Sequence, residues 1–187
     1  MTHPAELLGA PARRRLYWFL FVATFAWIGV MQYLAKDFAS IAGPKGETYD
    51  IVAFELAHTS ERAAAILAVW GDSGTAAALV QTYADYVFLI LYSSLIAMGI
   101  LAVVSGLPEK SGWLRTGRTL AWLQWVAALC DGIENAAMIV SMKSGPVVPL
   151  PQVAYYFAAV KFGIIIAGLL FLLIALPVQY RDRTASN

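Results

Sequence analysis

Four ionisable side chains stand inside long apolar stretches of the sequence, where a charge is costly. They are Asp85, Asp131, Glu134 and Lys161. At the centre of a lipid-facing helix each would cost roughly 2.5 to 3.5 kcal/mol, so such residues normally face protein or water. Three carboxyl groups against one lysine leave an imbalance of charge, so either one carboxyl stays protonated or a cation binds. Such groups build acid/base sites and also proton or cation pathways.

The spacing of these residues predicts that they meet at one depth. Each lies about nine to twelve residues from the expected outer end of its helix, which is about 13 to 18 Å at the usual rise. Asp131, Glu134 and Asn135 share a helix face because they are three and four residues apart. Asp85 shares a face with Tyr92, seven residues further on. We therefore expect a polar cavity that opens towards the outer side of the membrane.

The expected roles follow from this placement. Three carboxylates are the candidate catalytic groups, and a second set of polar and aromatic residues would bind or orient a substrate. The candidate catalytic residues are Asp85, Asp131 and Glu134, and the candidate substrate-binding residues are Tyr92, Gln124, Asn135, Lys161, Tyr155 and Trp125. A structural alternative is that Lys161 pairs with Asp131 or Glu134, and Asn135 with Asp85, only to hold helices together.

Four apolar stretches position these residues, and each is long enough to cross a bilayer core of about 30 Å. They are residues 16–35, 75–105, 114–142 and 152–178. With 60% hydrophobic residues, 13% charged residues and a mean hydropathy of +0.66, the 187-residue chain is predicted to be an integral membrane protein. The predicted fold class is all-α, a single four-helix transmembrane bundle over 1–187 with an amphipathic helix in the first extracytoplasmic loop. We expect the termini, 1–12 and 181–187, to be flexible tails.

The amphipathic helix is predicted over residues 49–70, a segment too polar to span a membrane. Thr48 or Asp50 would cap its start, Gly71 suits its end, and Thr59-Ser60 is a possible break into two helices. Such a helix would lie in the interface or cover the bundle as a lid. The candidate gating residues on this segment are Glu55, His58 and Arg62.

The distribution of basic residues predicts the orientation. Apart from Lys161, eight Lys and Arg residues fall on the side of the termini and four on the other side, so both termini are expected in the cytoplasm. The compact, cysteine-poor design favours a bacterial inner membrane. The net charge of +1 argues against nucleic acid as a partner. Single Cys130 and two distant histidines do not provide disulfides, zinc sites or paired haem ligands, and we expect no cofactor.

Among the possible chemistries, metal-free acid/base catalysis on an apolar lipid or isoprenoid fits best. The sequence lacks a Ser/His/Asp or Cys/His arrangement and a glycine-rich phosphate loop. Mg²⁺ on the carboxylates is a minor alternative, because few basic residues remain for phosphates. The expected reaction, an isomerisation, cyclisation or hydration, is similar in plan to that of small membrane sterol isomerases and terpene cyclases, whose motifs are not matched. Competing functions are a proton- or cation-coupled carrier, a lipophile-binding protein and a subunit of a larger complex. The expected partners are membrane lipids, an apolar small molecule and a second copy of the chain.

Overall fold

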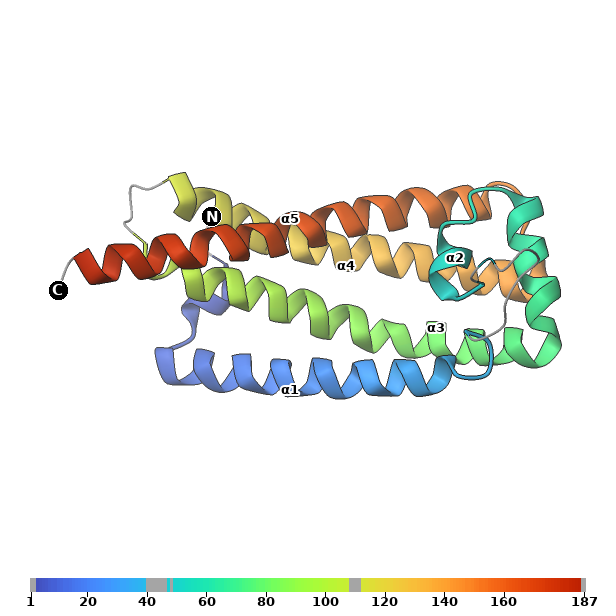
Figure 1. Ribbon diagram of the computed structural model, residues 1–187, viewed down its shortest axis with the longest axis horizontal. Coiled ribbons are helices and arrows are strands. Elements are labelled where there is room, and N and C mark those ends of the chain that lie inside the picture. Colours follow the sequence, from blue (N-terminus) through green and yellow to red (C-terminus); the bar gives the residue numbers. More distant parts are fainter. Residues whose placement is uncertain (1–2, 40–46, 48, 108–111, 186–187) are drawn as a thin grey trace. The chain divides into compact units, whose positions relative to one another are not determined.

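The structure, a computed structural model, describes residues 3–39, 47, 49–107 and 112–185; most of these residues are helical, and none of them lies in a strand. Four long helices and two short ones follow one another along the chain (Figure 1). They are the 3-10 helix η1 (Pro4–Leu7) and the α-helices α1 (Ala10–Ala35), α2 (Ile51–Glu55), α3 (Ser60–Val104), α4 (Gly112–Ser144) and α5 (Leu150–Ala185).

The four long helices are long and apolar enough to cross a membrane, as the sequence predicts. Among them α4 is the least apolar, and its apolar run contains Gln124, Asp131, Glu134 and Asn135. The helices extend beyond the predicted spans: α1 begins at Ala10, and its 26 residues would measure about 39 Å. The chain is thus consistent with a multi-pass membrane protein.

The chain forms two compact units, and every long helix contributes residues to both. Unit 1 consists of Met1–Thr24, Ile90–Ala128 and Lys161–Asn187, and unit 2 of Phe25–Leu89 and Leu129–Val160.

In unit 2, α3 starts with a short segment that ends in a turn at Gly71. This glycine has φ 62° and ψ −170°, a combination that is essentially restricted to glycine. Figure 1 shows the sharp turn, where the segment before Gly71 meets the long part of α3. The predicted helix end at Gly71 is therefore confirmed. The predicted break near Thr59-Ser60 is also present, because α2 ends at Glu55 and α3 begins at Ser60.

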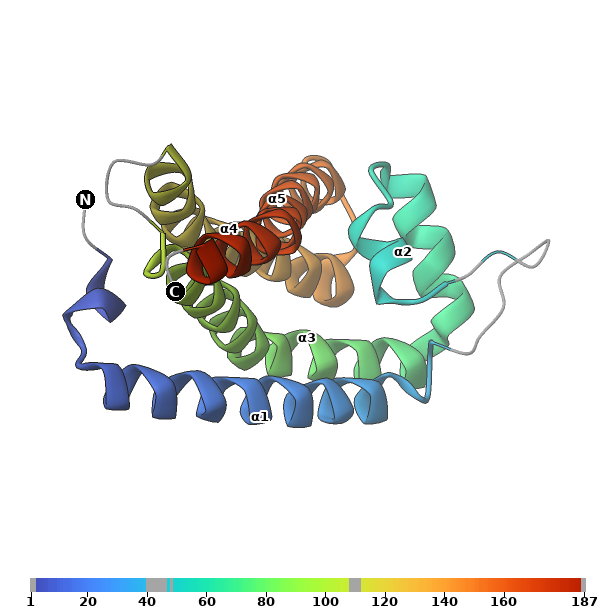
Figure 2. The same cartoon turned by 60° about the vertical axis from the view of Figure 1, so that its left-hand side comes forward.

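Phe38, which follows α1, and Phe54 of α2 pack against Trp70 in the first segment of α3. Asp50 caps α2 by accepting a hydrogen bond of 2.8 Å from the amide of Ala53, as expected, whereas Thr48 lies outside the described residues. The Trp70 ring lies 4.9 Å from Phe38 and 5.2 Å from Phe54, measured between ring centroids. Figure 2 shows α2 beside the first segment of α3. These aromatic contacts form the core at this end of unit 2.

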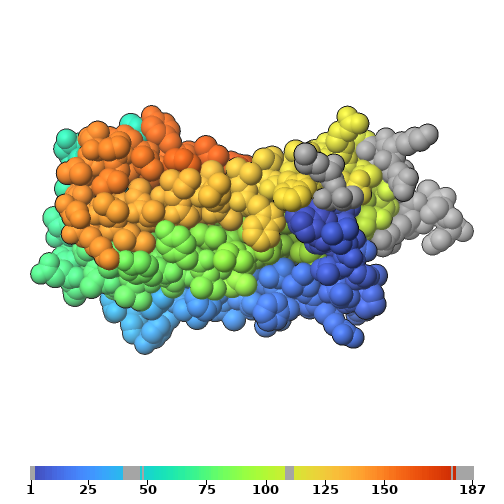
Figure 3. All heavy atoms as spheres, turned by 180° about the vertical axis from the view of Figure 1, so that it is seen from behind, coloured from blue at the N-terminus to red at the C-terminus, as the bar shows by residue number. Residues whose placement is uncertain are grey.

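Unit 1 contains an ordered N-terminal segment, and the expectation of a flexible tail over 1–12 is wrong for its described part. The amide of His3 donates to Glu6 Oε2 at 2.8 Å, and the amide of Ala5 donates to His3 Nδ1 at 3.2 Å, and the two bonds form a capping box at the start of η1. Glu6 Oε1 also accepts bonds of 3.0 and 2.7 Å from Arg118 of α4. The His3 ring lies 5.0 Å from that of Trp122. In Figure 3 this dark blue segment lies against the yellow start of α4. At the other end, α5 continues to Ala185, into the second expected tail.

Acidification is expected to release η1 from α4. Burial lowers the pKa of His3 more than the Glu6 carboxylate raises it, so the net pKa lies below the ordinary 6.5. Burial raises the pKa of Glu6, but the hydrogen bonds and charge of Arg118 and His3 lower it further, so the net pKa lies below 4.5. Both groups therefore bind protons more readily when η1 is released, and docking that is complete near neutral pH is lost as the pH falls through each lowered pKa.

Amide hydrogen exchange of residues 3–8, corrected for the intrinsic effect of pH, measures this release. Protection should decrease below pH 6.5 for His3 and again below pH 4.5 for Glu6. The Arg118→Gln variant should lack the second step. Protection that stays constant down to pH 4 would show that neither group governs the docking.

Candidate active site

The three candidate catalytic carboxyl groups all lie in unit 2. Asp85 is on α3 and is half-buried, whereas Asp131 and Glu134 are on α4 and are 2% and 0% exposed. Their helical spacing places Asp131, Glu134 and Asn135 on adjoining positions of α4. Asp131 and Glu134 therefore form an acidic face of α4 that is shielded from water, and the third carboxyl group lies on α3.

Two hydrogen bonds join α3 to α4 at this level. Asn135 Nδ2 donates to Asp85 Oδ2 at 2.7 Å, and the Tyr86 hydroxyl donates to the carbonyl oxygen of Gly132 at 3.0 Å. The structure thus joins α3 to α4 next to the acidic groups of α4, and the expected pairing of Asn135 with Asp85 is present.

Removing the amide at position 135 is expected to weaken the contact between α3 and α4. An Asn135→Leu variant loses the hydrogen bond to Asp85, which should lower the free energy of unfolding by about 1 to 2 kcal/mol. The exchange variant Asp85→Asn/Asn135→Asp retains one carboxyl and one amide and should recover most of this loss. Unfolding in mixed detergent micelles measures both values. An exchange variant no more stable than Asn135→Leu would argue that the hydrogen bond does not stabilise this contact.

The candidate gating residues lie in unit 2 but have different surroundings. Glu55, the last residue of α2, is 9% exposed. His58 has φ 58°, and its ring centroid lies 4.7 Å from that of Tyr155 on α5. The Arg62 guanidinium binds Glu47 at 2.6 Å and the Tyr49 hydroxyl at 3.0 Å. His58, which lies between α2 and α3, thus forms an aromatic contact with α5. Arg62 of α3 binds two residues that precede α2.

The remaining candidate residues, Tyr92, Gln124, Trp125 and Lys161, belong to unit 1. Tyr92 and Lys161 are buried, and Lys161 Nζ lies 4.7 Å from the centroid of the Phe162 ring. Gln124 is fully buried, and its Nε2 donates to the carbonyl oxygens of Leu120 and Ile164, both at 3.4 Å. Because Ile164 is on α5, Gln124 joins α4 to α5, a helix-joining role that the sequence did not indicate.

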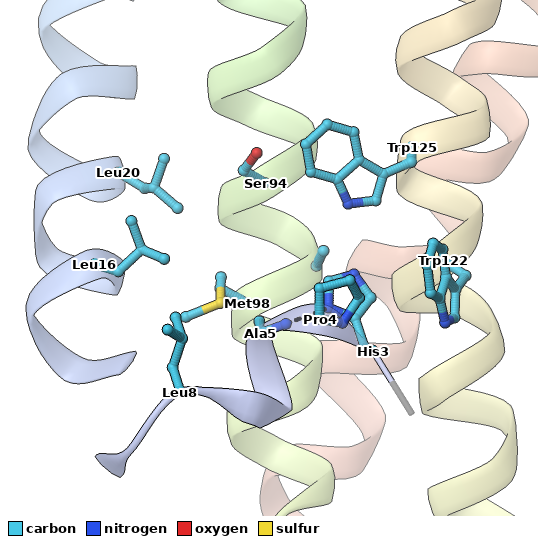
Figure 4. A pocket seen from close by; sticks show the side chains of 11 residues that line it. His3, Pro4, Ala5, Leu8, Leu16, Leu20, Ser94, Met98, Trp122 and Trp125 are labelled. Carbon is cyan, nitrogen blue, oxygen red and sulfur yellow. Dashed lines mark hydrogen bonds between the residues drawn. The ribbon is translucent and has the colours of Figure 1, made fainter. Parts of the chain in front are cut away.

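Trp125 lines an apolar groove in unit 1 that sequence reasoning missed. The groove has a volume of about 610 Å³. Figure 4 shows Leu16 and Leu20 of α1 on one side, Trp122 and Trp125 of α4 on the other, and Met98 of α3 between them. His3 and Leu8 of the N-terminal segment complete the lining. No pattern in the sequence could indicate this groove, because it requires the N-terminal segment to fold against α4.

A second hollow, in unit 2, has a volume of about 650 Å³ and lies at the turn of α3. Gly71, Asp72 and Thr75 line it together with Met142 and Lys143 of α4, and the three candidate catalytic carboxyl groups do not. The polar cavity around those carboxyl groups stays a prediction. Within residues 3–39, 47, 49–107 and 112–185, no three His, Cys, Asp or Glu side chains are grouped so that they could hold a metal ion.

The arrangement is suited to proton transfer in an environment that excludes water. Buried carboxyl groups can donate and accept protons, and the neighbouring amide and phenol groups can orient them through hydrogen bonds. No family model, curated protein or solved structure matches the chain.

Proposed function

We propose that the protein is an integral membrane enzyme that uses buried carboxyl groups for acid/base chemistry on an apolar lipid or isoprenoid. The observation that carries this proposal is the placement of Asp85, Asp131 and Glu134 in one unit, with Asp131 and Glu134 shielded from water. A carboxylic acid in such surroundings can give its proton to an alkene, an epoxide or a carbonyl group, and a second carboxylate can accept a proton from a neighbouring carbon.

In this proposal Asp131 and Glu134 are the acid/base pair. Asp85 supplies the second acid or orients the substrate, and its bond to Asn135 holds its carboxylate in place. The roles expected of Tyr92 and Lys161, which belong to unit 1, stay predictions from the sequence. The contact of His58 with Tyr155 would control entry from the outer side.

The proposed topology is a bundle of four transmembrane helices with both termini in the cytoplasm of a bacterium and with α2 and the start of α3 as an outer cover. It is supported by the excess of Lys and Arg on the side of the termini. Two members of that count, Lys45 and Lys110, lie outside the described residues. In a Cys130→Ala background, labelling of single cysteines placed at Asp37 and at Gly112, with a reagent that does not cross membranes, tests the topology: only the first should react in intact cells.

A lipophile-binding protein or carrier is the second candidate, because the groove in unit 1 is lined mainly by apolar residues and contains no carboxylate. Such a protein would bind a lipid at Trp122 and Trp125 without changing it. The two functions therefore differ in whether the bound lipid is altered.

Transfer of a solvent proton to carbon distinguishes them without knowledge of the substrate. Isomerisation, hydration and cyclisation initiated at an alkene each place one solvent proton on a carbon atom. Purified protein in mild detergent is incubated with neutral and isoprenoid lipids of the host in D₂O, and the lipids are then analysed by mass spectrometry. The enzyme should introduce deuterium that does not wash out in H₂O. A lipid that binds, gains no deuterium and keeps its chemical structure supports a carrier and contradicts the proposal.

A further inference from the structure

Three consecutive arginines at the start of α1 carry positive charge that the described residues do not neutralise. Arg13, Arg14 and Arg15 directly precede the apolar part of α1. None of their guanidinium groups has a hydrogen bond or an ion pair with another residue of the described part of the chain. Arg118 of the same unit differs, because it is paired with Glu6 at 2.7 Å. The start of α1 therefore presents cations at the border between an apolar span and water.

Two of these arginines line a hollow in unit 1. It lies between the start of α1 and the end of α3 and has a volume of about 250 Å³. Its polar lining consists of Arg13, Arg14, Tyr17 and Ser105, whereas Met98 and Leu101, which are 6% and 4% exposed, form an apolar floor. The hollow thus combines guanidinium groups with an apolar surface at the end of two membrane-spanning helices.

This combination selects an anion that is attached to an apolar chain. Guanidinium groups bind phosphate oxygens in a bidentate manner, and the Tyr17 hydroxyl group can add a hydrogen bond. A soluble anion would contact only the polar lining and would leave Met98 and Leu101 uncovered. A zwitterionic phospholipid carries its own cation next to the phosphate, which weakens its attraction to two arginines that no described residue neutralises.

We propose that this hollow binds the phosphate headgroup of an anionic phospholipid, with the start of an acyl chain on its apolar floor. The site requires no residue of the proposed acid/base centre, and its occupancy is independent of that proposal. Each arginine near a membrane surface contributes about 1 kcal/mol to the binding of anionic lipid, which is about fivefold in affinity.

Native mass spectrometry of the purified protein tests the site by titration with phosphatidylglycerol and with phosphatidylcholine of the same acyl chains. The wild type should retain phosphatidylglycerol in preference. Arg13→Gln should reduce this retention about fivefold, and Arg13→Gln/Arg14→Gln about 25-fold. The matched control is Arg115→Gln, which removes one exposed arginine of unit 1 that does not line the hollow. Ala102→Phe keeps every charge and fills the hollow, so it should also reduce retention.

Equal loss of retention in Arg13→Gln and Arg115→Gln would overturn the proposal, because net charge alone would then be responsible. Unchanged retention in Ala102→Phe would also overturn it, since the hollow would not be occupied. Complete displacement of the lipid by millimolar glycerol 3-phosphate would identify a site for a soluble anion instead. A circular dichroism melting curve for each variant confirms that the fold is intact, and the Arg13→Lys variant, which retains the charge, should recover part of the binding.

Discussion

Replacing Asp131 by asparagine should reduce the incorporation of deuterium into the lipid by a factor of about 10² to 10⁴, the usual contribution of a general acid or base. Asparagine has nearly the same shape as aspartate and can still form hydrogen bonds, but it cannot take up or give a proton. Because Asp131 is only 2% exposed, water is poorly placed to substitute for its carboxyl group. The initial rate of deuterium incorporation in D₂O measures the effect, and Glu134→Gln should show a loss of the same order.

The matched control is Asp72→Asn, which removes an exposed carboxylate of the same unit. This variant should incorporate deuterium at the rate of the wild type. Thermal unfolding of Asp131→Asn should occur within a few degrees of the wild type, so that lost turnover reports on chemistry rather than on folding. A folded Asp131→Asn variant with full activity would contradict the assignment of this residue and shift the role to Asp85 or Glu134.

The largest effect on stability is expected from Gly117→Ala in α4. A Cβ atom at this position would lie 2.9 Å from Cζ of Phe171 on α5 and even closer to Cγ1 of Val104 on α3. Both neighbours are buried, at 6% and 1% exposure, so neither can move without disturbing the core of unit 1. Overpacking of this kind costs about 1 to 3 kcal/mol, and thermal unfolding in detergent should show a lower midpoint.

A compensating variant separates this steric effect from the intrinsic preferences of the two residues. Alanine is a better helix former than glycine, so an exposed glycine in a helix should tolerate the same change. Gly112→Ala at the start of α4 is this control, because open space surrounds the Cβ position of residue 112. The double variant Gly117→Ala/Val104→Ala removes the closest contact and should recover part of the loss. A Gly117→Ala variant as stable as the wild type would show that α3, α4 and α5 pack less closely at this point.

Local signals made several features predictable. The four spans follow from composition, because a bilayer requires about 20 apolar residues in each crossing helix. The turn at Gly71 and the cap at Asp50 depend on the conformational range of glycine and on a carboxylate within reach of the third amide. The common face of Asp131, Glu134 and Asn135 follows from helical periodicity.

Other features depend on residues that are distant in the sequence. Glu6 and Arg118 are separated by 112 positions, so nothing in the N-terminal sequence indicated that η1 would dock on α4. The helix-joining role of Gln124 requires the carbonyl oxygen of Ile164 on another helix. The apolar groove needs three helices and the N-terminal segment, and composition does not report which faces of apolar helices leave such a space.

The sequence by itself determined that the protein is helical, that four stretches can cross a membrane and that four ionisable groups stand within them. These properties depend on the local cost of apolar and charged residues, which neighbours along the chain reveal. Only the tertiary structure decided that Asn135 pairs with Asp85, that Arg62 pairs with Glu47 and that the N-terminal segment covers α4. Such choices compare partners that the chain brings together only when it folds, so local pattern cannot rank them.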